Sequence, residues 1–266
     1  MIYVGEDFDA GRSVWLPLPG DGGAHVVVAG SSGGGKTQML HALLCQLAEL
    51  QHTALVISDP AQMDFLPWAP RASCVAYGRI GASWLLDQVE REMSWRLREG
   101  RRLGVQRIVP SAAIPRLIVV VDEVSMVTLG GPKGAALRLV DIAQVGRKVS
   151  IGLVLATQSP KATVLPRLVL EQCPSRICFR TEEPEQTDAI LGTQRIPAHS
   201  IPFRNRGEGY VRLPDGGYAH VKAAYADDER IARAVRETAH LTPTLPADRG
   251  WQRTFDPTDD DSKETA

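Results

Sequence analysis

A glycine-rich segment between an expected strand and an expected helix constrains this chain more than any other feature. Residues 30–37 read Gly-Ser-Ser-Gly-Gly-Gly-Lys-Thr and fit the pattern G-x-x-x-x-G-K-[ST]. They follow the apolar run at residues 25–29 and open residues 37–50, where apolar side chains recur at helical spacing. Glycines let successive main-chain N–H groups point at a phosphate, and a helix N-terminus adds a favourable dipole. The segment therefore predicts a phosphate-binding loop rather than a glycine-rich turn that binds nothing.

The residues of this loop have separate expected roles. Lys36 is expected to reach the β- and γ-phosphates of a nucleotide, and the Thr37 hydroxyl is expected to bind Mg²⁺. The loop therefore predicts ATP and Mg²⁺ as cofactors. The residues expected to bind the nucleotide are Gly30, Ser31, Ser32, Gly33, Gly34, Gly35, Lys36 and Thr37.

A second apolar strand, expected at residues 117–121, ends in two carboxylates, Asp122 and Glu123. Asp122 would hold the Mg²⁺ through its water shell, and Glu123 would polarise the attacking water. Two acids at a strand end are also common at a solvated edge. Because they follow a phosphate loop at the expected distance, we interpret them as a metal residue and a catalytic residue.

A third strand, expected at residues 151–156, is followed by Thr157 and Gln158. Gln158 could hydrogen-bond the γ-phosphate or the attacking water, or it could be an ordinary polar strand end. Arg147 lies shortly before this strand, and an arginine aimed at the γ-phosphate of a neighbouring subunit can be worth about 10³ in rate. Arg147 could equally be a surface residue, and Arg176 and Arg180 are competing candidates.

The alternation of short β-branched runs with longer helical patterns predicts an α/β fold. Near-continuous apolar strands indicate a mainly parallel sheet with helices on both faces. The expected strands are residues 25–29, 54–58, 117–121, 151–156 and 175–180, and the expected helices are residues 37–50, 83–99 and 135–145. Residues 207–221 predict a C-terminal hairpin that turns at residues 214–217. We expect one domain over residues 1–242 and a Pro- and Asp-rich, disordered acidic tail over residues 243–266.

The charge composition limits how this chain can contact nucleic acid. The formal net charge of −1 over 266 residues gives no global electrostatic case for nucleic acid, so any such contact must be local. The densest basic segment is residues 91–107, which is either such a patch or a solvated helix face.

The apolar runs are too short to cross a bilayer, and no signal peptide is visible. Four scattered cysteines predict reduced core thiols in a cytoplasmic protein and no zinc site: Cys45, Cys74, Cys173 and Cys178.

Taken in order, these motifs resemble the FtsK/SpoIIIE branch of the HerA–FtsK family of P-loop motor ATPases. The matching segments are residues 25–37, 119–123, 146–158, 174–180, 187–192 and 207–212, so the resemblance covers about residues 3–236. It implies a RecA-like motor domain that works as a homo-oligomeric ring, usually a hexamer, with ATP at subunit interfaces and double-stranded DNA in the channel. By position, Arg147 matches the family's arginine before the Thr-Gln strand, which implies a role in trans. Many relatives read Asp-Pro-Lys where this chain has Asp59-Pro60-Ala61, which puts in doubt any contact made by that lysine.

The membrane region and the small winged-helix domain of the large chromosomal translocases are not visible, so the chain resembles the small stand-alone versions of actinobacterial plasmids and phages. The resemblance favours an ATP-driven translocase of double-stranded DNA that acts in DNA transfer, partition or packaging, without membrane insertion. A protein that recruits the motor is a further candidate partner. Two alternatives remain: a protein-export motor of the type VII secretion kind, and a nucleotide-dependent regulatory switch.

Overall fold

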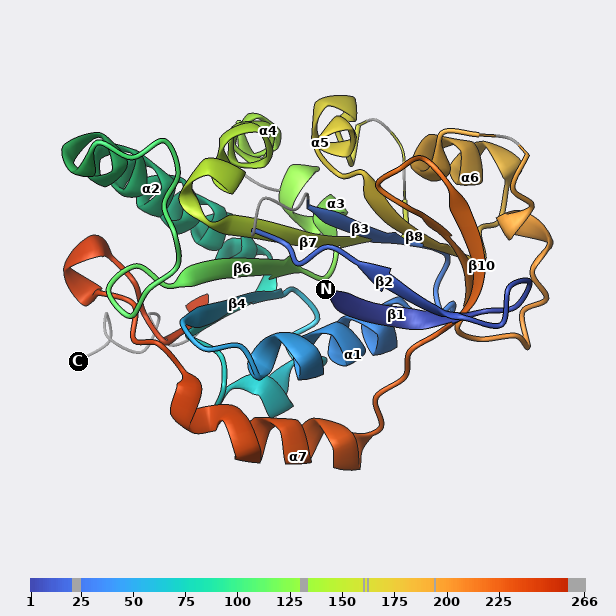
Figure 1. The fold of residues 1–266 in the computed structure, drawn as a ribbon, viewed down its shortest axis with the longest axis horizontal. Coiled ribbons are helices and arrows are strands. Elements are labelled where there is room, and N and C mark those ends of the chain that lie inside the picture. Colours follow the sequence, from blue (N-terminus) through green and yellow to red (C-terminus); the bar gives the residue numbers. More distant parts are fainter. Residues whose placement is uncertain (21–24, 130–133, 160, 162, 194, 258–266) are drawn as a thin grey trace.

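Across the residues that the structure describes, one eleven-stranded mixed sheet organises the fold (Figure 1). The computed structural model describes residues 1–20, 25–129, 134–159, 161, 163–193 and 195–257. The strands are β1 (Ile2–Asp7), β2 (Ser13–Leu16), β3 (Val26–Ala29), β4 (Thr53–Asp59), β5 (Cys74–Tyr77), β6 (Arg116–Val121), β7 (Ile151–Thr157), β8 (Ser175–Phe179), β9 (Glu208–Arg212), β10 (Tyr218–Ala223) and β11 (Thr254–Phe255).

The strand order across the sheet is β11-β5-β4-β6-β7-β3-β8-β9-β10-β1-β2. Pairing is parallel from β11 to β8 and antiparallel from β8 to β2. In the parallel part the carboxyl ends of the strands meet at one edge of the sheet, which is where ligands of open α/β sheets bind. The mainly parallel sheet and the hairpin of β9 and β10 confirm the predicted α/β fold.

Helices cover both faces of the sheet, with α2, α4 and α5 on one side and α1 and α7 on the other (Figure 1). The helices are α1 (Lys36–Ala48), α2 (Gly78–Leu103), α3 (Val124–Thr128), α4 (Ala135–Val145), α5 (Arg167–Glu171), α6 (Pro184–Leu191) and α7 (Asp228–Thr238). Short 3-10 turns are η1 (Leu66–Trp68), η2 (Gly146–Val149), η3 (Ala198–Ser200), η4 (Ala239–Leu241) and η5 (Ala247–Arg249).

Two separate apolar cores explain why the middle of each central strand carries apolar side chains at consecutive positions. In β4, Val56 packs into the core beneath α2 and α4, while Leu55 and Ile57 pack into the core beneath α1 and α7. Successive side chains of a strand point to opposite faces, so a strand covered on both faces needs apolar residues throughout. All seven residues of β4 are buried.

The structure differs from the sequence prediction at the start of the C-terminal tail. Residues 243–257 pack on the domain: Leu245 and Trp251 are buried, and β11 extends the sheet by pairing with β5. Phe255 stacks on Trp84 with ring centroids 4.5 Å apart. The predicted disorder of residues 243–257 therefore does not hold, because three apolar side chains in a polar segment find burial sites on the sheet edge and on α2. The rest of the predicted tail, residues 258–266, lies outside the described residues.

All four cysteines are buried free thiols. No helix within the described ranges is both long and apolar enough to span a membrane. In the basic segment at residues 91–107, Arg96 is fully buried and Arg102 pairs with Glu99, so part of that positive charge is neutralised inside the chain.

Candidate nucleotide site

The phosphate loop leaves β3 at Gly30 and enters α1 at Lys36, and its shape requires glycine at particular positions. Gly35 has φ of +118°, and a Cβ there would lie 3.2 Å from the backbone of Gly207. Gly30 has φ of +149°, and its Cβ would lie 2.8 Å from the Cβ of Phe179. L-residues with a side chain rarely adopt such φ values, so the loop depends on glycine for both conformation and space. The loop is also tied to the neighbouring segment, since the amide of Gly207 donates to the carbonyl of Gly34 at 3.0 Å.

Lys36, the first residue of α1, lies against this loop with 7 % of its surface exposed. Its Nζ donates to the carbonyl of Gly30 at 2.8 Å and to the carbonyl of Ser31 at 3.0 Å. Burial lowers the pKa of this ammonium, and the negative charges of Glu123 and Asp122 oppose that shift. The phosphate loop and the two predicted acids therefore interact electrostatically across one site.

Glu123 follows β6 and is held by three donors. Its Oε1 accepts from the Ser125 amide at 3.1 Å and from the Thr157 hydroxyl at 3.2 Å, and its Oε2 accepts from the Gln158 amide at 2.9 Å. The carboxylate therefore caps α3 and at the same time bridges the ends of β6 and β7. This fixes its orientation at the carboxyl edge of the sheet.

Asp122 lies in a strongly negative environment. The pKa of Asp122 is raised to about 7, mainly by burial and also by the charges of Asp64, Asp59 and Glu123, while the charge of Lys36 opposes the shift. The carboxylate of Asp59 closes the turn after β4, because it accepts from the amides of residues 62 and 65 at 2.9 and 3.0 Å. A group of acids that raise one another's pKa favours the binding of a cation.

A cavity of about 830 Å³ joins these groups. Pockets for small molecules and cofactors commonly measure about 300–1,000 Å³, so a nucleotide fits this volume. Of the predicted residues, the lining includes Ser32, Gly33, Gly35, Lys36, Thr37, Asp122, Glu123 and Gln158. The structure therefore brings the phosphate loop, both acids and Gln158 together.

The donor set also suits magnesium. Within the described residues, no cluster of three or more His, Cys, Asp or Glu side chains could hold a metal by itself. Mg²⁺ does not need one, since it is usually bound by one or two protein oxygens together with substrate phosphates and water. The Thr37 hydroxyl and the Asp122 carboxylate line the same cavity, where the hydroxyl would bind Mg²⁺ and the carboxylate would hold it through its water shell.

The far wall of the cavity was not anticipated from the sequence. It is formed by Arg206 and Gly207 and by the end of β10 with the residues after it, Lys222, Ala223, Ala224 and Tyr225. Pro60 and Ala61, from the segment that departs from the Asp-Pro-Lys pattern, also line the cavity. The one signal in the sequence was the segment at residues 207–212, which matched the family but carried no predicted role.

A model of the FtsK/SpoIIIE family matches residues 1–170 of this chain. The chain belongs to the FtsK/SpoIIIE family. The match contains the phosphate loop, both acids and the strand that ends at Thr157.

Curated relatives of this FtsK/SpoIIIE chain are longer proteins. The DNA translocase FtsK of Mycobacterium tuberculosis is 26% identical over 240 residues, which are 79% of this chain and 28% of that protein. The DNA translocase FtsK of Helicobacter pylori is 29% identical over 230 residues, which are 79% of this chain and 26% of that protein. The chain thus spans about a quarter of the length of these relatives.

Solved structures show the same fold. The cytoplasmic domain of the type VII secretion ATPase EccC from Thermomonospora curvata superposes with a TM-score of 0.76 at 23% identity, covering 96% of this chain and 32% of that chain. The pCW3 conjugation coupling protein TcpA, in its monomer form with ATPgS, gives 0.71 at 21% identity, covering 89% and 70%. At these identities the likeness concerns the fold alone.

The three candidate arginines of this FtsK/SpoIIIE chain lie in different places. Arg147 is exposed in η2, at the amino end of β7, and is not among the described residues that line the cavity. Arg176 is half-buried, and its guanidinium donates to the carbonyls of residues 170, 173 and 190 at 2.7, 2.7 and 2.8 Å. Arg180 lies beside its own phosphate loop, 3.3 Å from the Ser31 hydroxyl. Of the three, Arg147 has the exposure that contact with a neighbouring subunit requires.

Proposed function

We propose that this chain hydrolyses ATP in the described cavity and uses the energy to move double-stranded DNA. The observation that carries the hydrolysis is that Lys36, Asp122, Glu123 and Gln158 line one cavity although they come from separate parts of the chain. The choice of DNA rests on family membership and on the curated relatives, which are named DNA translocases.

Each residue of the cavity would have a separate role in ATP hydrolysis. The amides of the phosphate loop and the Lys36 ammonium bind the triphosphate, and Thr37 and Asp122 hold Mg²⁺. When bound, Mg²⁺ neutralises charge that develops on the phosphates. Glu123 takes the position of the general base, because its carboxylate is already oriented by donors from α3 and β7. The main-chain amide of Gln158 donates to that carboxylate, and the Gln158 side chain would orient the attacking water.

Arg147 would complete the site of a neighbouring subunit in a ring, for which a hexamer is the expected size. It lies at the amino end of β7, whereas the cavity of its own chain lies at the carboxyl ends of the strands. An arginine contributed in this way stabilises transition-state charge and can be worth about 10³ or more in rate.

The test is the ATPase rate of the full chain with and without double-stranded DNA. We expect the rate to rise several-fold with DNA and the stimulation to fall between about 50 mM and about 200 mM salt, as phosphate contacts require. Glu123→Gln, which keeps the shape of the side chain, should bind ATP without hydrolysing it. ATP binding in Lys36→Ala equal to that of the wild type would contradict the proposed site.

A protein-export motor is the second candidate, because solved relatives in fold include EccC ATPases 2 and 3 in complex with a signal sequence peptide. If DNA leaves the ATPase rate unchanged and a peptide raises it, the export function is favoured. A chain that binds ATP and a partner protein but moves neither DNA nor polypeptide would be a regulatory switch.

A further inference from the structure

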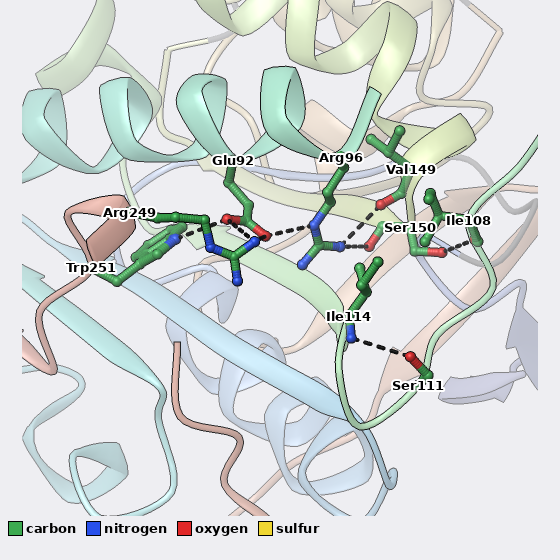
Figure 2. A network of polar contacts seen from close by, with 9 residues as sticks. All are labelled: Glu92, Arg96, Ile108, Ser111, Ile114, Val149, Ser150, Arg249 and Trp251. Atoms are coloured by element: carbon green, nitrogen blue, oxygen red, sulfur yellow. Dashed lines mark hydrogen bonds and ion pairs between the residues drawn. The ribbon is translucent and has the colours of Figure 1, made fainter. Parts of the chain in front are cut away.

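The C-terminal segment meets a buried carboxylate on α2. We call residues 246–255 the C-terminal strap. Figure 2 shows two of its side chains at Glu92: the Trp251 Nε1 donates to the carboxylate at 3.2 Å, and the Arg249 guanidinium lies 3.5 Å from it. The Glu92 side chain is only 1% exposed, and the Arg249 guanidinium also lies 3.8 Å from the ring centroid of Trp95. The strap is therefore fixed to α2 by specific polar contacts as well as by apolar burial.

The same carboxylate orients a buried arginine one helical turn further along α2. Glu92 Oε1 accepts from Arg96 Nε at 2.8 Å, and the Arg96 side chain is 0% exposed. The Nη1 of Arg96 donates to the carbonyls of Val149 at 3.0 Å and Ser150 at 3.4 Å (Figure 2). Since a guanidinium is planar, the contact on Nε fixes the direction in which Nη1 points.

These two carbonyls lie at the end of the turn that carries Arg147. Val149 is the last residue of η2, and Ser150 follows it with φ of +58°, a left-handed conformation that is strained for a residue with a side chain. Ser150 is held by several contacts: its hydroxyl donates to the carbonyl of Ile108 at 2.6 Å, and its own carbonyl accepts from the Leu117 amide at 2.9 Å. Strained residues persist only where their surroundings over-determine them, and Arg96 is part of those surroundings.

We propose that Arg96 is a positioning residue that holds the turn of Arg147. The C-terminal strap in turn fixes Arg96, because Trp251 and Arg249 contact the Glu92 carboxylate that orients it. This rests on the proposed function, in which Arg147 acts on the site of a neighbouring subunit. An exposed arginine accelerates hydrolysis only when its backbone holds it in the right place. A misplacement of about 1 Å can cost about a hundredfold in rate.

Two full-length variants test the two halves of this inference. Trp251→Phe keeps an aromatic ring at this buried position and removes the N–H that donates to Glu92, together with part of the indole volume. Arg96→Lys keeps a positive charge beside Glu92 and removes the fork that reaches the carbonyls of residues 149 and 150. We expect both to bind ATP with wild-type affinity, because the phosphate loop is untouched, while the hydrolysis rate falls by about tenfold or more.

Mixing subunits distinguishes positioning from a general loss of structure. Glu123→Gln subunits carry an intact Arg147 turn, so adding them to Arg96→Lys or Trp251→Phe subunits should restore hydrolysis at the variants' own sites. Arg98→Lys, an exposed arginine of the same helix, and Arg253→Ala, a strap arginine that contacts the carbonyls of residues 69 and 70, are matched controls that should hydrolyse ATP at the wild-type rate.

The outcomes separate this inference from the proposed function. If Arg147→Ala is not restored by Glu123→Gln subunits, the trans role fails and the positioning role fails with it. If Arg147→Ala is restored but both test variants hydrolyse ATP at the wild-type rate, only the positioning role is refuted. The positioning role is also refuted if the variants lose hydrolysis and do not recover it on mixing, or if their ATP affinity falls by the same factor as their hydrolysis rate. Should Arg96→Lys not fold, Trp251→Phe decides by the same criteria.

Discussion

Lowering the pH should destabilise this protein through one buried imidazole, that of His25. The His25 side chain is fully buried between α4 and β7. Its Nδ1 accepts from the Leu153 amide at 3.0 Å, so in the neutral form Nε2 carries the proton and donates to the carbonyl of Ala143 at 2.8 Å. A second proton would have to be placed on Nδ1, where it faces another N–H. The pKa of His25 is lowered to about 4, mainly by burial; the hydrogen bond to Ala143 opposes this shift, and the charge of Arg147 adds to it.

The size and direction of the effect follow from that pKa. In the unfolded chain the histidine pKa is about 6.5, so between about pH 6.5 and about pH 4 the unfolded state binds more protons than the folded state. The stability contribution is therefore complete above pH 6.5 and is lost progressively as the pH falls towards 4. A gap of about 2.5 pH units at about 1.4 kcal/mol each corresponds to about 3.5 kcal/mol, a large part of the stability of a typical domain.

The assay is the free energy of unfolding from denaturant titrations between about pH 7.5 and about pH 4. Carboxylates also titrate in this range, so the comparison is with His25→Gln, which removes the imidazole. Over this range its stability should change less steeply with pH, by up to about 1.4 kcal/mol per pH unit. His240→Gln, at an exposed histidine, is the control and should keep the wild-type slope. An unchanged slope in His25→Gln, or an NMR titration of His25 near pH 6.5, would refute the reasoning.

Three further predictions concern single side chains. Gly35→Ala should cost about 1–3 kcal/mol of stability and weaken ATP binding, because its Cβ would lie 3.2 Å from Gly207; Gly216→Ala, at an open turn with φ of +89°, should leave ATP affinity unchanged in the same titration. Glu123→Gln should lower the hydrolysis rate by about 10² to 10⁴ with ATP affinity retained, measured by single-turnover kinetics, and a rate near the wild type would exclude it as the base. Arg71→Met should cost about 2–3 kcal/mol in a denaturant titration, because the buried guanidinium donates to the last carbonyl of α1 at 2.9 and 3.0 Å; a loss below about 0.5 kcal/mol would contradict this.

The central strands, and the site at their carboxyl ends, were predictable because the sequence patterns that indicate them are local. A strand buried on both faces must be apolar along its length, which made β4 and β6 readable as continuous runs. Parallel strands present their carboxyl ends at one edge, so polar residues that end such runs can be expected to meet there. The structure shows this for Asp122, Glu123 and Gln158, which line one cavity.

The rest depended on contacts between distant parts of the sequence. Trp251 and Glu92 are separated by 159 positions, and nothing in the composition around Trp251 distinguishes a docked segment from a disordered tail. The raised pKa of Asp122 comes from burial and from acids on another loop, which sequence spacing does not reveal. The edge strand β2 is different: its burial alternates, but its sequence Ser-Val-Trp-Leu does not, because Trp15 is apolar and exposed between the buried Val14 and Leu16.

The geometry of β7 bears directly on whether Arg147 acts within its own chain or on a neighbour. The strand has seven residues, all buried, and joins the turn of Arg147 at one end to Gln158 at the other. At about 3.3 Å per residue it is about 23 Å long, further than any arginine side chain extends. Arg147 could reach the cavity of its own chain only if β7 left its pairings with β3 and β6, which would open both apolar cores. A contribution to hydrolysis by Arg147 would therefore require a second subunit.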